Sequence, residues 1–166
     1  GMDFNNPIMT SAAILILLLG SLSCTQIDLF EKTAVIPGHS WKSSFKPSFT
    51  FTIKDTSAPY MVYFIIRHDD RYSYKNIYVN LYAKGPGQDT AQGVPYDIRL
   101  ATDESGWLGS GMDDIYEHRT QLTPRAADKL FYFKKPGDYT FTIEQIMRED
   151  PLKNVWNTGI RIEKLQ

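Results

Sequence analysis

The sequence has little of several residue types on which whole classes of protein depend. It contains one cysteine in 166 residues, which excludes an intrachain disulfide and a cysteine-rich zinc site. It has no surplus of positive charge, because 18 Lys and Arg stand against 19 Asp and Glu. A nucleic-acid binder needs such a surplus to neutralise phosphates. The length fits one ordinary domain, so we expect no nucleic-acid partner and no second large domain.

Motifs of the common enzyme classes are also missing. Gly109-Ser110-Gly111 is not the Gly-x-Ser-x-Gly turn of hydrolases. Gly85-Pro86-Gly87 lacks the lysine and the following helix of a phosphate-binding loop. Glu117 and His118 are adjacent, so on a strand they would face opposite sides and form no acid–base pair. A hydrolase would need two carboxylates that converge in one cleft. We expect no enzymatic activity, no cofactor and no metal centre.

One apolar run lies near the N-terminus. Residues 12–19 are all apolar, and small residues follow up to Cys24. A membrane-spanning helix needs about 20 apolar residues, so this shorter run is typical of a secretory signal peptide. Leu22-Ser23-Cys24 resembles the lipobox of bacterial lipoproteins. That resemblance implies cleavage before Cys24, a diacylglycerol on its sulfur and an acyl group on its amine.

The lipoprotein interpretation divides the chain into three parts. Residues 1–23 are the signal peptide, residues 24–36 are a tether or a first edge strand, and residues 37–166 are the β-sandwich domain. The alternatives are an ordinary signal peptide with a coincidental cysteine, or a buried apolar helix. Removal of residues 1–23 removes Asp3 and no basic residue, so 18 acidic residues face 18 basic ones. A neutral body is not attracted to anionic lipid, so the lipid on Cys24 would hold the protein to its membrane.

Short segments of alternating polarity predict strands along the rest of the chain. Phe49, Phe51 and Ile53 alternate with threonines, which indicates a strand with one buried face. Residues 60–66 are continuously apolar and predict a central strand covered on both sides. Further strands are expected over 77–82, 96–100 and 160–165. A hairpin is expected between 130–134 and 139–143, around Lys135-Pro136-Gly137-Asp138.

Helical signals are weak. Short helical turns are expected at residues 123–129 and 113–119. A parallel α/β fold would need helical crossovers of adequate length, and the sequence offers none. The fold class that fits is all-β: a single antiparallel β-sandwich, of which a jelly roll is one form, behind the N-terminal signal peptide.

Three segments carry a family resemblance. They are 67–76 (RHDDRYSYKN), 103–111 (DESGWLGSG), and 145–152 (QIMREDPL) followed by Asn157-Thr158-Gly159-Ile160. In this order behind a lipobox, they resemble the gliding motility-associated lipoprotein GldH family of Bacteroidetes over essentially the whole mature chain. The resemblance implies an envelope lipoprotein that is needed for gliding in some members. It brings no catalytic residues.

The first of these segments is a candidate binding loop. It carries Arg67, His68, Tyr72, Tyr74 and Asn76 directly after the predicted central strand, and loops on a rigid sheet often bind ligands or partners. The alternative is a solvated hairpin in which the arginine pairs with an aspartate and the tyrosines pack on the sheet. A metal site that starts from the histidine would need three or four convergent ligands, which one sequence does not show.

The second segment belongs to a glycine-rich loop that runs to Asp114, with Trp107 in its middle. Trp107 is a candidate platform for a sugar ring, with Asp103, Asp113 and Asp114 accepting hydroxyl hydrogen bonds. Calcium is a second option for these acidic oxygens, although the spacing lacks the Asp-x-Asp-x-Asp-Gly pattern. In the structural alternative, Trp107 plugs one end of the sandwich and the glycines form turns.

The function that we expect is a non-enzymatic scaffold or accessory component of a motility or transport complex, with envelope proteins as partners. We expect the anchor in the outer membrane, facing the periplasm. Gln26 follows the lipobox, and it is not an aspartate. In lipoproteins of some bacteria, an aspartate near this point favours retention in the inner membrane, so its absence favours the outer membrane. The alternatives are a carbohydrate-binding module that uses Trp107 or Trp156 as its platform, and a hydrolase.

Overall fold

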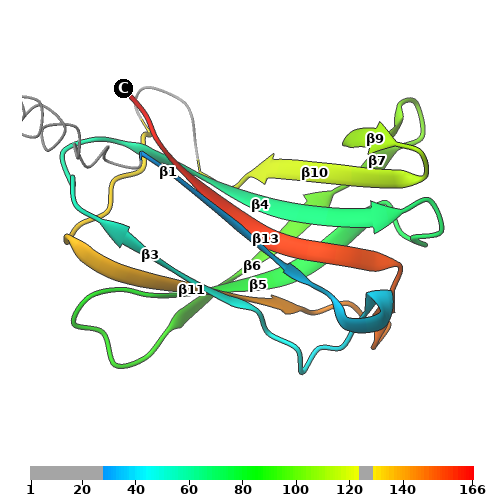
Figure 1. Cartoon of the computed structure of the whole chain (residues 1–166), viewed down its shortest axis with the longest axis horizontal. Coiled ribbons are helices and arrows are strands. Elements are labelled where there is room, and N and C mark those ends of the chain that lie inside the picture. The colour runs from blue at the N-terminus through cyan, green and yellow to red at the C-terminus, as the bar shows by residue number, and fades with distance from the viewer. Residues whose placement is uncertain (1–27, 124–128) are drawn as a thin grey trace, which may run out of the picture.

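The computed structural model describes residues 28–123 and 129–166, which form two stacked antiparallel sheets (Figure 1). The larger sheet has the order β1 (Leu29–Val35), β13 (Val155–Lys164), β4 (Tyr60–Asp69), β10 (Ile115–Gln121) and β9 (Ser110–Met112). The smaller sheet has the order β3 (Ser48–Ile53), β11 (Gly137–Gln145), β5 (Asn76–Lys84) and β6 (Gln92–Arg99). Two short pairs join β12 (Leu152–Lys153) to β2 (Ser40–Trp41) and β7 (Ala101–Thr102) to β8 (Gly106–Trp107), and a 3-10 turn, η1, spans Pro37–His39. The expected all-β sandwich is confirmed.

The core lies between the two sheets, as the sequence patterns predict. In β3, Phe49, Phe51 and Ile53 are buried and the residues between them are exposed. In β4, Phe64 and Ile66 belong to the same core cluster. Each alternating strand therefore turns its apolar side chains inward and its polar ones to the outer face.

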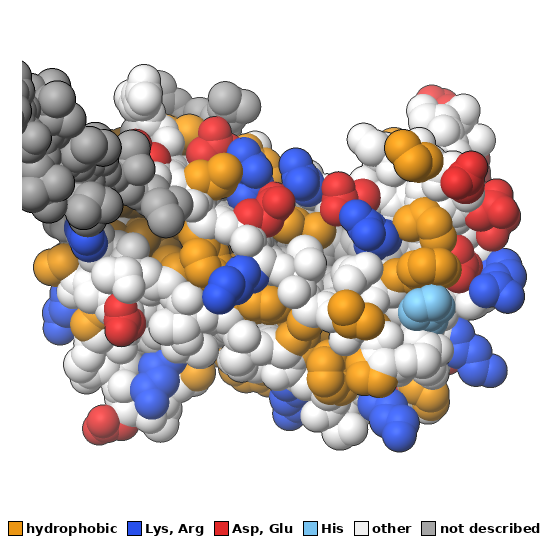
Figure 2. All heavy atoms as spheres, viewed as in Figure 1, with side chains coloured by type: hydrophobic (Ala, Val, Ile, Leu, Met, Phe, Trp, Pro, Cys, Tyr) orange, Lys and Arg blue, Asp and Glu red, His pale blue; other side chains and the backbone are white. Residues whose placement is uncertain are grey.

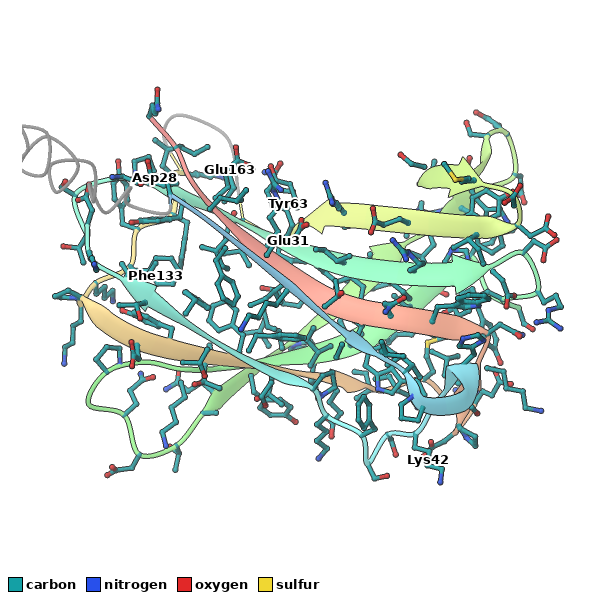
Figure 3. All side chains as sticks on the ribbon, in the orientation of Figure 1. Asp28, Glu31, Lys42, Tyr63, Phe133 and Glu163 are labelled. Carbon is teal, nitrogen blue, oxygen red and sulfur yellow. The ribbon has the colours of Figure 1, made fainter. Side chains whose placement is uncertain are left out.

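β4 is the central strand of the larger sheet and is buried on both faces. Ile65 points to the outer face but is only 1% exposed. Its neighbours on the outer face include Arg119 of β10, which pairs with Glu31 of β1 at 3.2 Å, and Arg161 of β13, which pairs with Glu31 at 3.3 Å. The long aliphatic stems of arginines cover apolar surface while their heads stay in water. Figure 3 shows Glu31 and Tyr63 on this outer face.

The expected hairpin around Lys135-Pro136-Gly137-Asp138 is wrong. Residues 130–134 form no strand, and β11 pairs with β3 and β5 instead. Phe131 makes one isolated bridge to Tyr60, and Phe133 is 4% exposed and packs edge-on to Tyr60 at 5.2 Å. Figure 3 places Phe133 at one end of the sandwich, between the sheets. These aromatic side chains close that end of the core, so their backbone does not extend the sheet.

The helical turn expected at residues 113–119 is also wrong. These residues turn at 113–114 and then form β10, which pairs with β4 over its whole length. Pairing with a central strand buries one face of the segment, and this gain outweighs its weak helical preference. The turn expected at 123–129 falls largely outside the described residues, as do the proposed signal peptide and Cys24. In the described part of the chain, no helix has the length and apolarity to cross a membrane.

The long axis of the sandwich separates two ends (Figure 1). The proximal end is the one where β1 begins and β13 ends, and there the backbone N–H of Lys164 donates to the carbonyl of Asp28 at 2.9 Å. The distal end is the one where β4 ends at Asp69 and β10 begins at Ile115, residues that oppose each other in the sheet. Figure 3 labels Asp28 at the proximal end. Asp28 is the first described residue after the N-terminal segment.

Candidate functional site

Segments far apart in the sequence meet at the distal end. The backbone N–H of Asp70 donates to the carbonyl of Asp114 at 3.0 Å, which joins the two candidate loops. Lys75 of the first loop forms an ion pair with Asp103 of the second. The side-chain amide of Asn154 donates to the carbonyl of Arg71 at 3.2 Å. The two candidate loops and the start of β13 therefore form one surface.

His68 lies under this surface and is paired with a histidine from the neighbouring strand. The Nε2 atoms of His68 and His118 are 2.8 Å apart, and both side chains are almost fully buried. The Nδ1 of His68 lies 2.8 Å from the carbonyl oxygen of Asp69. A carbonyl only accepts, so Nδ1 of His68 carries the proton and its Nε2 accepts from His118. Burial lowers the pKa of both histidines, that of His118 to about 4, so the pair is neutral near pH 7.

Aromatic rings cover the histidine pair. The ring centroid of His68 is 4.4 Å from Trp107, 5.1 Å from Tyr72 and 5.8 Å from Tyr116. Trp107 is part-buried and packs against the core cluster. One side of its ring is thus engaged with His68, and the tryptophan contributes to closing the distal end of the sandwich.

Asp69 holds the start of β13 to the first loop. Its Oδ2 accepts from the Nε1–H of Trp156 at 3.0 Å, and its Oδ1 accepts from the backbone N–H of Arg71 at 2.9 Å. Burial would raise the pKa of this carboxyl, but the donors from Trp156 and Arg71 lower it overall. Trp156 also stacks on His39 with ring centroids 3.9 Å apart. Of the two tryptophans named as sugar platforms, Trp156 therefore has one ring face covered by a histidine, and Trp107 packs against His68 at a tilt of 58°.

The remaining residues of the first loop are largely engaged. Tyr72 is 4% exposed, its hydroxyl donates to the carbonyl of Asn76 at 2.7 Å, and burial raises its pKa. Tyr74 packs edge-on to Tyr72 at 5.8 Å. Arg67 lies outside the loop on the outer face of β4, where it pairs with Glu117 at 3.4 Å and not with an aspartate.

The acidic residues of the second loop are exposed. The ion pair with Lys75 lowers the pKa of Asp103. Asp113 adopts a left-handed backbone (φ 56°) in the turn between β9 and β10, and Asp114 follows it. Figure 2 shows acidic side chains gathered at the distal end, on the right of the view. Among the described residues, no group of three or more His, Cys, Asp or Glu side chains is arranged to hold a metal ion.

A shallow hollow opens beside the first loop. It has a volume of about 210 Å³ and is lined by Lys75, Asn76, Asp97 and Arg99. The amide of Asn76 donates to Oδ1 of Asp97 at 2.8 Å. The hollow lies on the outer face of the smaller sheet, where β5 begins and β6 ends.

Sequence reasoning named Asn76 but missed the other three residues of the hollow, and it missed His118 as the partner of His68. Alternation along residues 96–100 already places Asp97 and Arg99 on the exposed face of a strand. The sequence does not show which strand lies next to the strand of residues 96–100. β6 meets Asn76, and β10 meets His68, only because of the strand order.

The fold and the site define a class of protein. It is a β-sandwich that gathers polar and aromatic loops at one end, with its buried histidines engaged in a neutral pair. The model of the GldH lipoprotein family matches residues 28–162, so the chain belongs to the GldH lipoprotein family. A "Gliding motility lipoprotein GldH homolog" of Christiangramia forsetii is 26% identical over 155 residues, which cover 86% of this chain and 87% of the homologue.

A solved structure shows a much more distant likeness. The VP2 subviral particle of infectious bursal disease virus aligns with 82% of this chain at a TM-score of 0.32 and 8% identity. The alignment covers 30% of that viral chain. A likeness at this level supports no inference about this protein.

Family membership supports a coarse statement about location. A lipoprotein family of this kind implies attachment to a membrane through lipid and association with the cell envelope. The GldH family is not a known family of enzymes.

Proposed function

We propose that this protein is a non-enzymatic envelope lipoprotein that is anchored through Cys24 and acts as a scaffold or accessory component of a gliding-motility complex. The observation that carries the proposal is the separation of the two ends of the sandwich. Cys24 precedes Asp28 by four residues, which reach about 14 Å when fully extended. A lipid on Cys24 would therefore keep the proximal end near the membrane and direct the distal loops toward partners.

The link to gliding is supported by the relative. The homologue in Christiangramia forsetii carries gliding motility in its name. An anchor confines a domain to one membrane face, which raises its effective concentration for partners on that face. We place the anchor in the outer membrane with the sandwich in the periplasm, in line with Gln26 beside the lipobox.

A non-enzymatic role is supported by the chemistry of the distal end. General acid–base catalysis needs a group within reach of a substrate proton and with a pKa near the working pH. His68 and His118 are buried, paired with each other and neutral near pH 7. Asp103 is held ionised by Lys75. These groups stabilise the distal loops.

The experiment that tests this proposal is site-specific photo-crosslinking in intact cells. A photoreactive residue at Asp113, which is exposed at the distal end, should yield a discrete crosslinked adduct with an envelope protein. The same residue at Lys54, which is exposed and follows β3 at the proximal end, is the matched control. Adducts that are absent from position 113, or identical from both positions, would refute a scaffold role for the distal loops.

A further inference from the structure

The outer face of β5 and β6 carries a row of opposed polar and aromatic side chains. In the register of these strands, Asn76 faces Arg99, Tyr78 faces Asp97, and Tyr82 faces Gly93. Directly opposed residues on one face of an antiparallel pair have Cβ atoms about 5 Å apart. We call Asn76, Tyr78, Asp97, Arg99 and Ile146 the β5–β6 strip.

The strip has an exposed apolar platform. Tyr78 is 45% exposed and Ile146 is 39% exposed. The backbone N–H of Ile146 donates to the carbonyl of Tyr78 at 2.9 Å, so Ile146 continues the row on the other side of Tyr78. Tyr78 thus has an apolar neighbour on one side and the carboxylate of Asp97 on the other. An aromatic ring with such neighbours suits the C–H face of a sugar ring, which is apolar, while the sugar hydroxyls need polar partners.

The platform adjoins the hollow, whose polar groups are of two complementary kinds. Asp97 uses one oxygen to accept from Asn76, which leaves Oδ2 as an acceptor. Arg99 is exposed, and its guanidinium forms no hydrogen bond or ion pair with any residue of 28–123 or 129–166. A carboxylate only accepts and a guanidinium only donates. The pair Asp97 and Arg99 therefore suits a ligand that carries both hydroxyl donors and an anionic acceptor.

The charge balance narrows the ligand class. The hollow has two cations, Lys75 and Arg99, and one anion, Asp97. Lys75 is already paired with Asp103, and the charge of Arg99 also lowers the pKa of that carboxyl, but no ion pair joins Arg99 to Asp103, so its guanidinium can still bind a ligand. A planar guanidinium binds a carboxylate through two parallel hydrogen bonds. A simple inorganic anion would gain nothing from Asp97 or from the platform of Tyr78.

We propose that the β5–β6 strip binds a carboxylated saccharide. One sugar ring lies on Tyr78 and Ile146, its hydroxyls donate to Asp97, and its carboxylate accepts from Arg99. The hollow of about 210 Å³ is smaller than a typical ligand pocket of about 300–1,000 Å³. It therefore holds one residue of the saccharide, and the rest of the chain crosses the open face of the sheet. Tyr82 lies flat over Gly93 further along this face, since a Cβ on Gly93 would be 2.7 Å from its ring.

The test begins with the full chain, purified in detergent, on an array of oligosaccharides. The array holds uronate- and sialate-containing, sulfated, phosphorylated and neutral members. We expect the carboxylated members to bind, and titration calorimetry with the strongest one then gives its Kd. The proposal would be overturned if no carboxylated member bound. It would also be overturned if sulfated and neutral members bound as strongly as the carboxylated ones.

Matched variants place the binding on the strip. We expect Tyr78→Ala and Arg99→Gln each to raise the Kd tenfold or more, and Tyr78→Phe to keep most of the affinity. Tyr132→Ala is the control for the ring, because Tyr132 is 46% exposed and lies beside Phe131. Arg119→Gln is the control for the charge, because Arg119 lies on the outer face of the larger sheet. Equal losses in Tyr78→Ala and Tyr132→Ala would refute the site.

These substitutions are all at exposed positions, and thermal melting shows that each variant folds before its Kd is compared.

A methyl ester of the strongest uronate ligand removes the charge of the ligand's carboxylate and keeps the shape of the sugar. We expect its affinity to fall tenfold or more for the wild type but not for Arg99→Gln. The site does not depend on the scaffold role, since crosslinking from position 113 detects a protein partner and calorimetry detects a saccharide, so either proposal can fail while the other holds.

Discussion

The pairing of His68 with His118 shows how two buried polar side chains satisfy each other in an apolar environment. Each ring offers one donor and one acceptor when neutral, and the carbonyl of Asp69 determines which nitrogen of His68 carries the proton. Within the described residues, no buried side-chain nitrogen or oxygen lacks a partner. An unsatisfied buried polar group costs about 1–3 kcal/mol, so the pair contributes to the stability of the distal end as a unit.

This pair makes stability depend on pH in a defined window. The pKa of His118 is about 4 in the folded protein, against 6.5 for an ordinary histidine. The unfolded chain therefore binds more protons between these values, and stability falls as the pH falls through the window. For His118 alone, the loss between pH 7 and pH 5 is about 2 kcal/mol, from 1.36 kcal/mol per pKa unit. Urea unfolding at the two pH values measures it.

The variant His118→Gln separates this effect from general acid denaturation. A glutamine amide still donates to His68 but does not titrate. We expect the variant to lose less stability than the wild type between pH 7 and pH 5. The pKa values of Asp69 and Glu144 are lowered from ordinary values of 3.8 and 4.5, which already lie below pH 5, so these carboxyls contribute little to the change between pH 7 and pH 5. An unchanged loss of stability in His118→Gln would show that the histidine pair does not cause it.

At the scale of elements, β1 docks on β13 at a point where a side chain would not fit. Gly159 of β13 opposes Thr33 of β1. A Cβ on Gly159 would lie 2.7 Å from the Cα of Thr33 and would contact the carbonyl oxygen of Lys32. β1 is an edge strand that pairs only with β13 among the described strands, and it is the element that leads back to the proposed anchor. The docking of β1 on β13 therefore holds the chain that follows the proposed anchor to the rest of the sandwich.

We expect Gly159→Ala to lower the free energy of unfolding by about 1–3 kcal/mol, the range for overpacking a tight site. The amides of β1 should also exchange with solvent faster, because the strand is pushed away from β13. Hydrogen exchange followed by mass spectrometry measures both effects. Gly38→Ala is the control, because nothing lies within 4 Å of its Cβ and only its left-handed backbone (φ 61°) opposes the change. This control should cost about 1–2 kcal/mol and leave β1 protected; rapid exchange of β1 in both variants would contradict the explanation.

At the scale of the whole molecule, the proposed lipid anchor on Cys24 and an electrostatically neutral body would divide the tasks of attachment and recognition. The chain that follows residue 23 has 18 acidic and 18 basic residues, so it gains little from anionic headgroups. Each buried CH₂ of an acyl chain contributes about 0.8 kcal/mol, and two or three chains hold a protein firmly. Membrane attachment through Cys24 would therefore be insensitive to salt.

We expect Cys24→Ser to move the protein from the membrane fraction to the soluble fraction, because the serine oxygen does not accept the diacylglycerol. A wash of wild-type membranes with 1 M NaCl should release none of it, since screening at this concentration removes only electrostatic attraction. Fractionation followed by immunoblotting measures both. Membrane association of Cys24→Ser equal to that of the wild type would refute the anchor.

Local signals in the sequence predicted part of this fold correctly. The alternation of Phe49, Phe51 and Ile53 and the apolar run of β4 each depend on neighbouring residues alone. The hairpin predicted around Pro136 also depended on neighbouring residues alone, and it was wrong. The turn residues are local, but Phe131 and Phe133 meet the core at Tyr60, which is far away in the sequence.

The sequence by itself determined that the chain is all-β, that its outward and inward faces alternate along the strands, and that its distinctive segments match the GldH family. These properties follow from side-chain period and from short motifs, which need no long-range contact. Only the tertiary structure decided that His68 meets His118, and that Tyr78 and Asp97 lie side by side. Such contacts depend on strand order and register, which the burial of the whole core selects and no single segment encodes.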